Sequence, residues 1–401
     1  MSTPPSGGPL AGVRVVDAST IVFGPFASMM LADLGAEVIK IENPRSGGEV
    51  MRHAGASPAP GMGPIFMALN RNKKSVGLDL ATDAGKRALT KLLEGADVFF
   101  HNVRLAGMER LGFGYEAVKA LNPSIVYVHC AGYGAAGPYA GRQALDDLVQ
   151  GATGFADLAT LRDGSPPAYA PTIVADKAAG LYAFGATTAA LYHRAVSGEG
   201  QFVAVPMFEA FTHFHMVENL YGQTFPGIDG PMGYTRTTSA NRKPYATADG
   251  FICIVPYLDD QWTRFFELGG RPDLASDPRF ADHTSRTEHT DELYALIEDV
   301  ARTRTTDEWM VLLGEAQIPA MRANRNEDVL ADPHLEAVGM FELREHPDAG
   351  PWRAVRPPLE FSATPGGIRH EPPALGADTA DVLREAGVTP EDLETILTAL
   401  D

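Results

Sequence analysis

The sequence predicts an α/β protein with a parallel sheet and a second, smaller domain, and three observations support this class. Short apolar segments typical of buried strands alternate with longer segments of helical character from residue 13 to residue 221. The repeated strand–helix–strand order requires parallel pairing with right-handed crossovers. After residue 223 the composition changes to Gly, Pro, Thr and Asn, without a long apolar period.

The first part of the chain supplies the sheet. We expect strands at 13–17, 37–42, 75–80, 97–102, 125–130 and 201–206. We expect helices at 27–34, 83–93, 105–121, 177–195 and 207–221. In such a sheet, ligands bind at the carboxyl ends of the strands.

The remaining segments define the expected domain boundaries. A strand at 250–255 and helices at 260–268, 285–302 and 306–317 form the small domain, 225–330. The large domain is expected to contain 1–224 and 331–401, with closing helices at 379–386 and 390–400. Thr389, Pro390 and Glu391 begin the last helix as cap, first-position proline and first-turn acid.

Composition excludes several classes of function. The 401 residues are 45% hydrophobic and carry a net charge of −18, which disfavours a nucleic-acid partner. No apolar stretch reaches the roughly 18 to 20 residues of a membrane span, and the N-terminus lacks the regions of a signal peptide. The only two cysteines, Cys130 and Cys253, form no disulfide framework, so we expect a cytoplasmic protein.

Metal and dinucleotide sites are not indicated. His213 and His215 lie two positions apart on an expected helix, so their side chains diverge. The first strand–helix loop, 18–26, lacks the G-x-G-x-x-G pattern that brings a pyrophosphate onto the backbone. A nicotinamide-dependent dehydrogenase therefore remains only a weak alternative.

Asp176 is the most informative single residue. It lies between a proline-rich loop, 166–172, and the small-residue helix expected from residue 177. One interpretation is an N-cap that accepts backbone N–H bonds. The other is a carboxylate nucleophile that forms an acyl intermediate.

Two basic segments are candidate anion sites. Residues 70–75 form a basic turn before a strand, where solvation is the simpler interpretation and phosphate contact the alternative. Asn102 lies at a strand carboxyl end, and Arg104 and Arg110 follow it. That position is where ligands bind in such sheets.

The chain resembles the class III coenzyme A transferases, the family that contains formyl-CoA and carnitinyl-CoA transferases and alpha-methylacyl-CoA racemase. The resemblance covers about residues 10–401. Its motifs lie at 10–17, 24–25, 31–42, 72–75, 78–79, 97–102, 112–115, 121–123, 137–139, 197–201 and 248–250. Asp176 falls where the family carries its catalytic aspartate.

The resemblance implies a Rossmann-like large domain whose parallel sheet is built from both chain ends, a smaller α+β domain and an interlocked homodimer. It implies that coenzyme A or acyl-CoA is a substrate, with no tightly bound cofactor. Position by position, Ile21, Val22 and Phe23 would line the pantetheine, and Asn43 would lie near the adenosine phosphates. Leu78 and Leu80 would flank the adenine, Asn102 and Arg110 would bind the nucleotide and pyrophosphate, and Arg104 would be an extra cation beside them.

Two departures from the family pattern narrow the function. Leu145 stands where the racemases carry a histidine, and a racemase needs a second acid/base group opposite the first. Residues 231–242 contain no counterpart of the glycine-rich lid of formyl-CoA transferases. We therefore expect a CoA-transferase with acyl-CoA and a carboxylic acid as partners. An isomerase of the same family and a non-catalytic CoA-binding protein remain alternatives.

Overall fold

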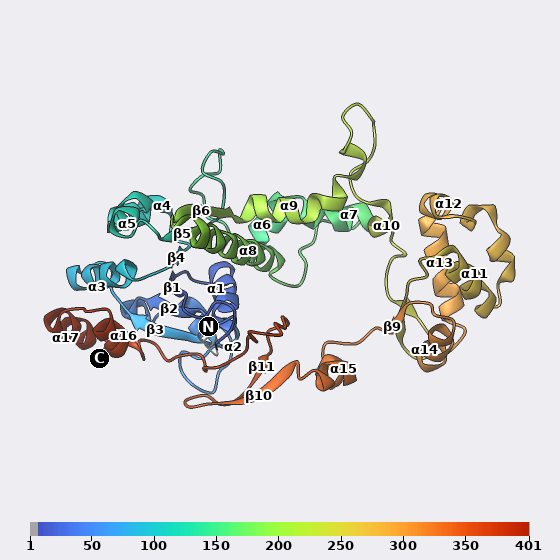
Figure 1. Ribbon diagram of the computed structural model, residues 1–401. Helices are drawn as coiled ribbons and strands as arrows, with labels where there is room; N and C mark the ends of the chain where they lie inside the picture. Colours follow the sequence, from blue (N-terminus) through green and yellow to red (C-terminus); the bar gives the residue numbers. More distant parts are fainter. Residues whose placement is uncertain (1–6, 401) are drawn as a thin grey trace. The chain divides into compact units, whose positions relative to one another are not determined.

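The computed structural model describes residues 7–400, and these divide into two compact units (Figure 1). The first contains the described residues up to Thr153, then Pro171–Phe214, and the residues from Ala337 onward. The second contains Gly154–Ala170 and His215–Glu336. The second unit thus includes a segment, Gly154–Ala170, that lies far outside the range 225–330 expected for the small domain.

A six-stranded sheet forms the centre of the first unit. Its strands are β1 Arg14–Ala18, β2 Glu37–Glu42, β3 Lys73–Gly77, β4 Val98–His101, β5 Val126–Ala131 and β6 Gln201–Pro206. They lie in the order β3-β2-β1-β4-β5-β6, and every neighbouring pair is parallel. The predicted parallel α/β sheet is confirmed, and the bounds of β2 and β6 are those expected from the sequence.

Helices cover both faces of this sheet, as a parallel sheet buried on two sides requires. They are α1 Phe23–Asp33, α2 Pro64–Asn70, α3 Asp83–Glu94, α4 Leu105–Leu111, α5 Tyr115–Leu121, α6 Asp146–Ala152 and α8 Val174–Ser197. The expected helix 105–121 is interrupted because Gly112 adopts φ 92°, a left-handed conformation that ends α4.

Alternation along the strands decides which residues meet which helices. Val16, Ile39, Phe99 and Tyr127 belong to a buried cluster that includes Leu89 of α3. On the opposite face, α1 and α8 pack against each other (Figure 1).

Small residues on α8 permit close packing with α1. A Cβ on Gly180 would lie 2.8 Å from a ring carbon of Phe26 and 3.1 Å from the carbonyl oxygen of Phe23. These separations are too short for ordinary van der Waals contact. The small-residue composition of this helix therefore reflects its contact with α1.

The C-terminal part of the chain completes the first unit without adding a described strand to the large sheet. It forms an antiparallel hairpin, β10 Phe341–His346 and β11 Gly350–Val355, followed by α16 Thr379–Glu385 and α17 Pro390–Thr398. The expectation that strands from both chain ends form the parallel sheet was wrong, because the six strands all lie between residues 14 and 206.

Instead, the C-terminal residues close the outer edge of β3. The Asp378 carboxylate accepts a 2.8 Å hydrogen bond from the Ser75 N–H, and the Thr379 hydroxyl oxygen accepts a 2.9 Å bond from the Gly77 N–H. Arg87 of α3 also pairs with Asp392 of α17 at 2.6 Å. Edge N–H groups that would otherwise be open to another strand are thereby satisfied.

The second unit is an independent α+β arrangement. Its helices are α7 Leu158–Asp163, α10 Thr235–Thr238, α11 Asp259–Leu268, α12 His283–Glu288, α13 Thr290–Ala301 and α14 Thr306–Glu315. Helices α9 Met207–Asn219 and α15 Pro333–Ala337 cross the unit boundaries. Its antiparallel sheet contains β7 Tyr245–Ala246, β8 Phe251–Ile254 and β9 Ala320–Arg322.

An aromatic core stabilises this second unit. Trp262, Phe265, Phe266 and Trp309 are buried together, and the Trp309 indole N–H donates a 2.8 Å hydrogen bond to the Ala301 carbonyl oxygen. Thr305 and Glu308 form a capping box at the start of α14.

The interlocked dimer stays a prediction.

Candidate active site

A cavity of about 830 Å³ lies in the first unit at the carboxyl ends of its strands. Thr20 follows β1, Asn102 follows β4, and residues of β5 and β6 complete the wall. The carboxyl ends of the strands are where ligands bind in open parallel α/β sheets. The cavity brings together six of the residues that the sequence singled out: Ile21, Phe23, Asn102, Arg104, Arg110 and Asp176.

Asp176 is the third residue of α8 and is not its N-cap. The N-cap is Ile173, and no side chain caps the helix. The N-cap interpretation was therefore wrong, since the helix begins three residues before the position that the sequence suggested. Among the described residues, no hydrogen bond reaches the Asp176 carboxylate, although the side chain is buried, with 8% of the residue exposed.

Asp146 fixes the backbone at Asp176. Oδ1 of Asp146 accepts a 2.9 Å hydrogen bond from the Asp176 N–H, and Oδ2 accepts a 2.6 Å bond from Nε2 of Gln150. Burial and, to a smaller extent, the nearby charge of Asp146 raise the pKa of Asp176 to about 7. Asp176 is therefore divided between its acid and carboxylate forms near neutral pH.

Two arginines give this cavity positive charge. Arg104 immediately precedes α4, and Arg110 lies in its last turn; both are exposed. Neither guanidinium pairs with a carboxylate among the described residues, and both line the cavity. Unpaired guanidinium groups are suited to bind phosphate oxygens.

Asn102 holds the loop after β1. Its Oδ1 accepts a 3.1 Å hydrogen bond from the Thr20 N–H, and its Nδ2 donates a 2.9 Å bond to the Thr20 carbonyl oxygen. Both ends of the amide are thus engaged by one residue of the loop. This contact gives Asn102 a structural task in addition to the nucleotide contact expected from the sequence.

The next residue of the loop, Ile21, adopts an unusual conformation. Its φ of 74° is strained for a β-branched side chain. The buried carboxylate of Glu49 accepts a 2.7 Å hydrogen bond from the Ile21 N–H and a 2.9 Å bond from Nζ of Lys40. Lys40 also donates to the Ser19 carbonyl oxygen at 2.9 Å. A buried ion pair therefore maintains the strained loop beside the cavity.

The other residues expected to contact coenzyme A do not line this cavity. Val22 and Leu78 are buried in two different hydrophobic clusters. Leu80 is half-buried and packs against the cluster that contains Leu78. Asn43 is exposed, and its side-chain oxygen accepts a 3.0 Å hydrogen bond from the Arg45 N–H. Their contacts with coenzyme A stay predictions.

Leu145 and His129 also line the cavity. Leu145 is 56% exposed and precedes α6, so no proton-transferring group stands at that position. Burial lowers the pKa of His129 to about 4, which leaves its imidazole neutral and weakly basic at pH 7. Burial also raises the pKa of the Cys130 thiol, which is unsuited to act as a nucleophile.

Sequence reasoning missed three acidic residues that support the site. Asp146 positions Asp176, Glu49 holds Ile21, and Glu209 accepts a 2.8 Å hydrogen bond from the Gly134 N–H in the cavity wall. Asp146 adjoins the singled-out Leu145, but its partner lies 30 positions away. No local pattern in the sequence indicates such a pairing.

Neither a metal centre nor a membrane helix accompanies this site in the part of the chain that the structure describes. No group of three or more His, Cys, Asp or Glu side chains among the described residues is arranged to hold a metal ion. Over the same residues, no helix combines the length and apolar character that crossing a membrane demands.

Comparison with a family model gives a match across most of the chain. The model described as CoA-transferase family III matches residues 10–379. The succinyl-CoA–D-citramalate CoA-transferase of Chloroflexus aurantiacus (strain ATCC 29366 / DSM 635 / J-10-fl) is 33% identical over 394 residues, covering 96% of each chain. The succinate–glutarate CoA-transferase of Agrobacterium fabrum (strain C58 / ATCC 33970) is 32% identical over 386 residues, covering 94% of this chain and 95% of the relative.

Solved structures agree with these sequence relatives. A CAIB/BAIF family protein from Brucella suis superposes with a TM-score of 0.80 and 30% identity, covering 95% of this chain and 100% of the other. Rv3272 from M. tuberculosis gives a TM-score of 0.79 and 30% identity, covering 94% and 99%.

Proposed function

Because the chain belongs to CoA-transferase family III, we propose that it moves coenzyme A from an acyl-CoA donor to a carboxylic acid acceptor through covalent intermediates on Asp176. The observation that carries the proposal is the Asp176 carboxylate itself. It is buried, receives no hydrogen bond from the described residues, and lines a cavity that also contains the free cations Arg104 and Arg110.

The first half of the reaction transfers coenzyme A to the enzyme. The Asp176 carboxylate attacks the thioester carbonyl, the carbon–sulfur bond breaks, and a mixed anhydride and the CoA thiolate result. The thiolate then attacks the aspartyl carbonyl of the anhydride. This step releases the donor carboxylate and leaves an aspartyl-CoA thioester.

The second half runs the same two steps in reverse order, with the acceptor acid in place of the donor acid. The acceptor carboxylate attacks the carbonyl of the aspartyl thioester. The carbon–sulfur bond breaks, which releases the CoA thiolate and leaves a second mixed anhydride between the acceptor and Asp176. The thiolate attacks the acceptor acyl carbonyl, which gives the new acyl-CoA and restores the Asp176 carboxylate. The overall reaction consumes one thioester and forms another, so the exchange needs no ATP.

The electrostatics of the cavity support these roles. A pKa near 7 leaves a substantial fraction of Asp176 ionised at neutral pH while keeping the carboxylate more basic than an exposed aspartate. At the start of α8 the Val174 N–H donates to the Thr172 carbonyl oxygen and the Lys177 N–H to the Ile173 carbonyl oxygen, so the Ala175 N–H is the candidate to stabilise the oxyanion. The Asp176 N–H is excluded from that task, because Asp146 already accepts it.

We assign coenzyme A to the first unit by the family resemblance. Ile21, Val22 and Phe23 would line the pantetheine, and Leu78 and Leu80 would flank the adenine. Asn43, Asn102, Arg104 and Arg110 would lie near the phosphates. The unpaired guanidinium groups of Arg104 and Arg110 support the phosphate assignment. We also propose that the enzyme acts as an interlocked homodimer.

The substrate pair follows from the named relatives as a proposal. Two relatives carry names that combine succinate or succinyl-CoA with a second dicarboxylic acid, so succinyl-CoA and short dicarboxylic acids are the first pair to test. Racemisation is disfavoured because the Leu145 side chain has no ionisable group to transfer a proton and His129, with a pKa of about 4, is a weak base.

Mass spectrometry tests the proposal in two ways. Acyl-CoA is mixed with a panel of isotopically labelled carboxylic acids, and label that appears in a new acyl-CoA demonstrates transfer. In parallel, the enzyme is incubated with acyl-CoA and reduced with borohydride, which converts an aspartyl thioester to an alcohol. We expect the reduced residue to be Asp176. Transfer without any modification of Asp176 would contradict the covalent mechanism.

A further inference from the structure

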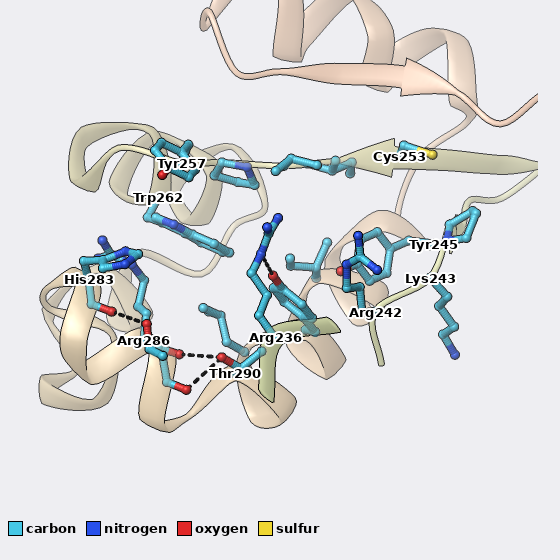
Figure 2. Close-up of a pocket in the computed structure, with 18 of the residues that line it drawn as sticks. Arg236, Arg242, Lys243, Tyr245, Cys253, Tyr257, Trp262, His283, Arg286 and Thr290 are labelled. Atoms are coloured by element: carbon cyan, nitrogen blue, oxygen red, sulfur yellow. Dashed lines mark hydrogen bonds between the residues drawn. The ribbon is translucent and has the colours of Figure 1, made fainter. Parts of the chain in front are cut away.

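The second unit contains a cavity of its own, with a volume of about 420 Å³ (Figure 2). All of the residues that line it lie between Tyr234 and Ile297, within this unit. They come from α10, from the segment 242–245 that leads into β7, from the end of β8 and the loop after it, and from helices α11, α12 and α13. The volume is within the range of small-molecule sites, about 300 to 1,000 Å³.

This cavity is positively charged in a chain with a net charge of −18. Arg236, Arg242, Lys243 and Arg286 line it, and no aspartate or glutamate does. Asp259 and Glu298, which do not line the cavity, pair with Arg286 and Lys243, so Arg236 and Arg242 are the two cations without a carboxylate partner among the described residues. Such an arrangement indicates that an anion from outside the chain completes it.

Two of the four cations are already occupied. Arg286 is buried, donates to the Phe280 carbonyl oxygen at 2.9 Å and pairs with Asp259. Lys243 pairs with Glu298 at 2.6 Å, and Figure 2 shows its amine pointing away from the other side chains. These two residues contribute to the field but are engaged elsewhere.

Arg236 and Arg242 remain for a ligand. Nε of Arg236 donates a 2.8 Å hydrogen bond to the Tyr294 hydroxyl, which fixes the guanidinium, while its two terminal nitrogens have no partner among the described residues. Figure 2 shows that end of Arg236 directed toward the strand side of the cavity. Arg242 has no side-chain partner among these residues and lies beside Tyr245 (Figure 2).

The rest of the wall combines aromatic and aliphatic side chains with the polar His283, Thr287 and Thr290. Tyr257 and Trp262 stand on the opposite side of Arg236 from Arg242 (Figure 2), and Ile254, Leu293 and Ile297 also line the cavity. A free terminal guanidinium edge matches the planar, bidentate geometry of a carboxylate. Two such groups in one cavity with aromatic and aliphatic wall residues between polar ones fit a ligand with two anionic ends and a short hydrocarbon body.

We propose that this cavity binds a short-chain dicarboxylate, with one carboxylate on Arg236, the other on Arg242 and the carbon chain against the aromatic and aliphatic wall residues. The proposal concerns binding alone and stands whether or not Asp176 carries the transfer reaction.

Isothermal titration calorimetry tests it with glutarate, succinate, butyrate and inorganic phosphate as separate probes. Wild-type protein should bind glutarate or succinate at least tenfold more tightly than butyrate, because butyrate has one anionic end. Arg236→Gln and Arg242→Gln should each weaken dicarboxylate binding at least tenfold. Arg325→Gln, an exposed arginine of the same unit that does not line the cavity, is the matched control and should bind as wild type does.

Two further variants separate this site from the cavity of the first unit. Asp176→Asn should retain full dicarboxylate affinity, so a failure of the transfer mechanism would leave the result unchanged. Affinity lost in Arg110→Ala but retained in Arg236→Gln and Arg242→Gln would place the acid in the first unit and overturn the proposal. Phosphate that binds more tightly than either dicarboxylate, with the same dependence on Arg236, would overturn the choice of ligand. Arg242 is exposed, so its variant keeps the test valid if Arg236→Gln does not fold.

Discussion

Asp146 accepts the backbone N–H of Asp176 at 2.9 Å, so a second carboxylate both positions the proposed nucleophile and raises its pKa. Burial is the larger cause of the raised pKa, and Asp146 adds to it. The contact joins the first turn of α6 to the first turn of α8.

We predict that Asp176→Asn abolishes CoA transfer, by at least about a thousandfold, while leaving acyl-CoA binding intact. The amide is close in shape to the carboxylate but is not a nucleophile toward a thioester. Initial rates of acyl exchange and the dissociation constant for an acyl-CoA are the two measurements. An Asp176→Asn variant that retains a tenth of the wild-type rate would refute the assignment, provided that deamidation back to aspartate is excluded by mass spectrometry.

The pH profile should reveal Asp176 directly. Because the carboxylate is the attacking form, kcat/KM for the acyl-CoA should rise with pH through about 7 and then level off. In Asp146→Asn the side-chain oxygen can still accept the Asp176 N–H, but the negative charge is gone. The rise should therefore move to lower pH while remaining above the range of an exposed aspartate, because burial persists. An unchanged midpoint would remove Asp146 as a cause.

The free energy of unfolding should also depend on the titration of Asp176, but it should fall as the pH rises, whereas kcat/KM rises. The folded-state pKa of about 7 exceeds the ordinary value of 3.8, so the folded protein binds more protons than the unfolded chain between these values. The contribution of Asp176 to the free energy of unfolding is therefore greatest below pH 3.8 and falls as the pH rises to 7. The total fall is at most about 4 kcal/mol.

Chemical denaturation of wild-type protein and Asp176→Asn across this pH window measures that contribution. The variant should gain stability relative to wild type from about pH 4 to about pH 7, since it lacks the titrating group. A stability difference that does not vary with pH would show that the pKa of Asp176 is not raised.

Arg110→Ala should raise KM for every acyl-CoA to a similar extent, about tenfold, with little change in kcat. The reason is that a contact with the phosphates is equal in the ground state and the transition state. Arg384→Ala, which removes an exposed arginine on α16 that does not line the cavity, is the control. Discrimination between short and long acyl groups by the Arg110 variant would instead place this residue near the acyl chain.

The enzyme should not epimerise 2-methylacyl-CoA thioesters efficiently. The Leu145 side chain has no ionisable group to transfer a proton, and His129, with a pKa of about 4, is a weak base. Proton NMR in D2O measures α-deuterium incorporation and inversion. Exchange with inversion at a rate comparable to CoA transfer would assign the protein to the isomerase branch.

Much of the fold follows from local patterns, and much of the site does not. The bounds of β2 and β6 coincide with the predicted strands, since Asn43 and Pro44 follow the first directly and Gly200 precedes the second. The break between α4 and α5 at Gly112 depends on a single backbone conformation, which a helical pattern hides. The assignment of Gly154–Ala170 to the second unit depends on tertiary packing alone.

The same distinction applies to the site. Six of the residues that line the first cavity were predicted from motif positions, and the strand ends bring them together. The supporting carboxylates of Asp146 and Glu49 act on residues 30 and 28 positions away. Contacts at such separations are properties of the folded chain, and one sequence without relatives contains no signal for them.

The closure of the β3 edge by Asp378 and Thr379 has a consequence for how the protein is made. The Ser75–Asp378 bond joins residues 303 positions apart, and a ribosome that adds roughly 5 to 20 residues per second needs about 15 to 60 s to synthesise that interval. During this time the β3 edge of the sheet has unpaired backbone N–H groups. A product truncated before residue 378 would keep that border and should associate with other chains, so nonsense mutations late in the gene are expected to yield aggregates rather than a shortened, working enzyme.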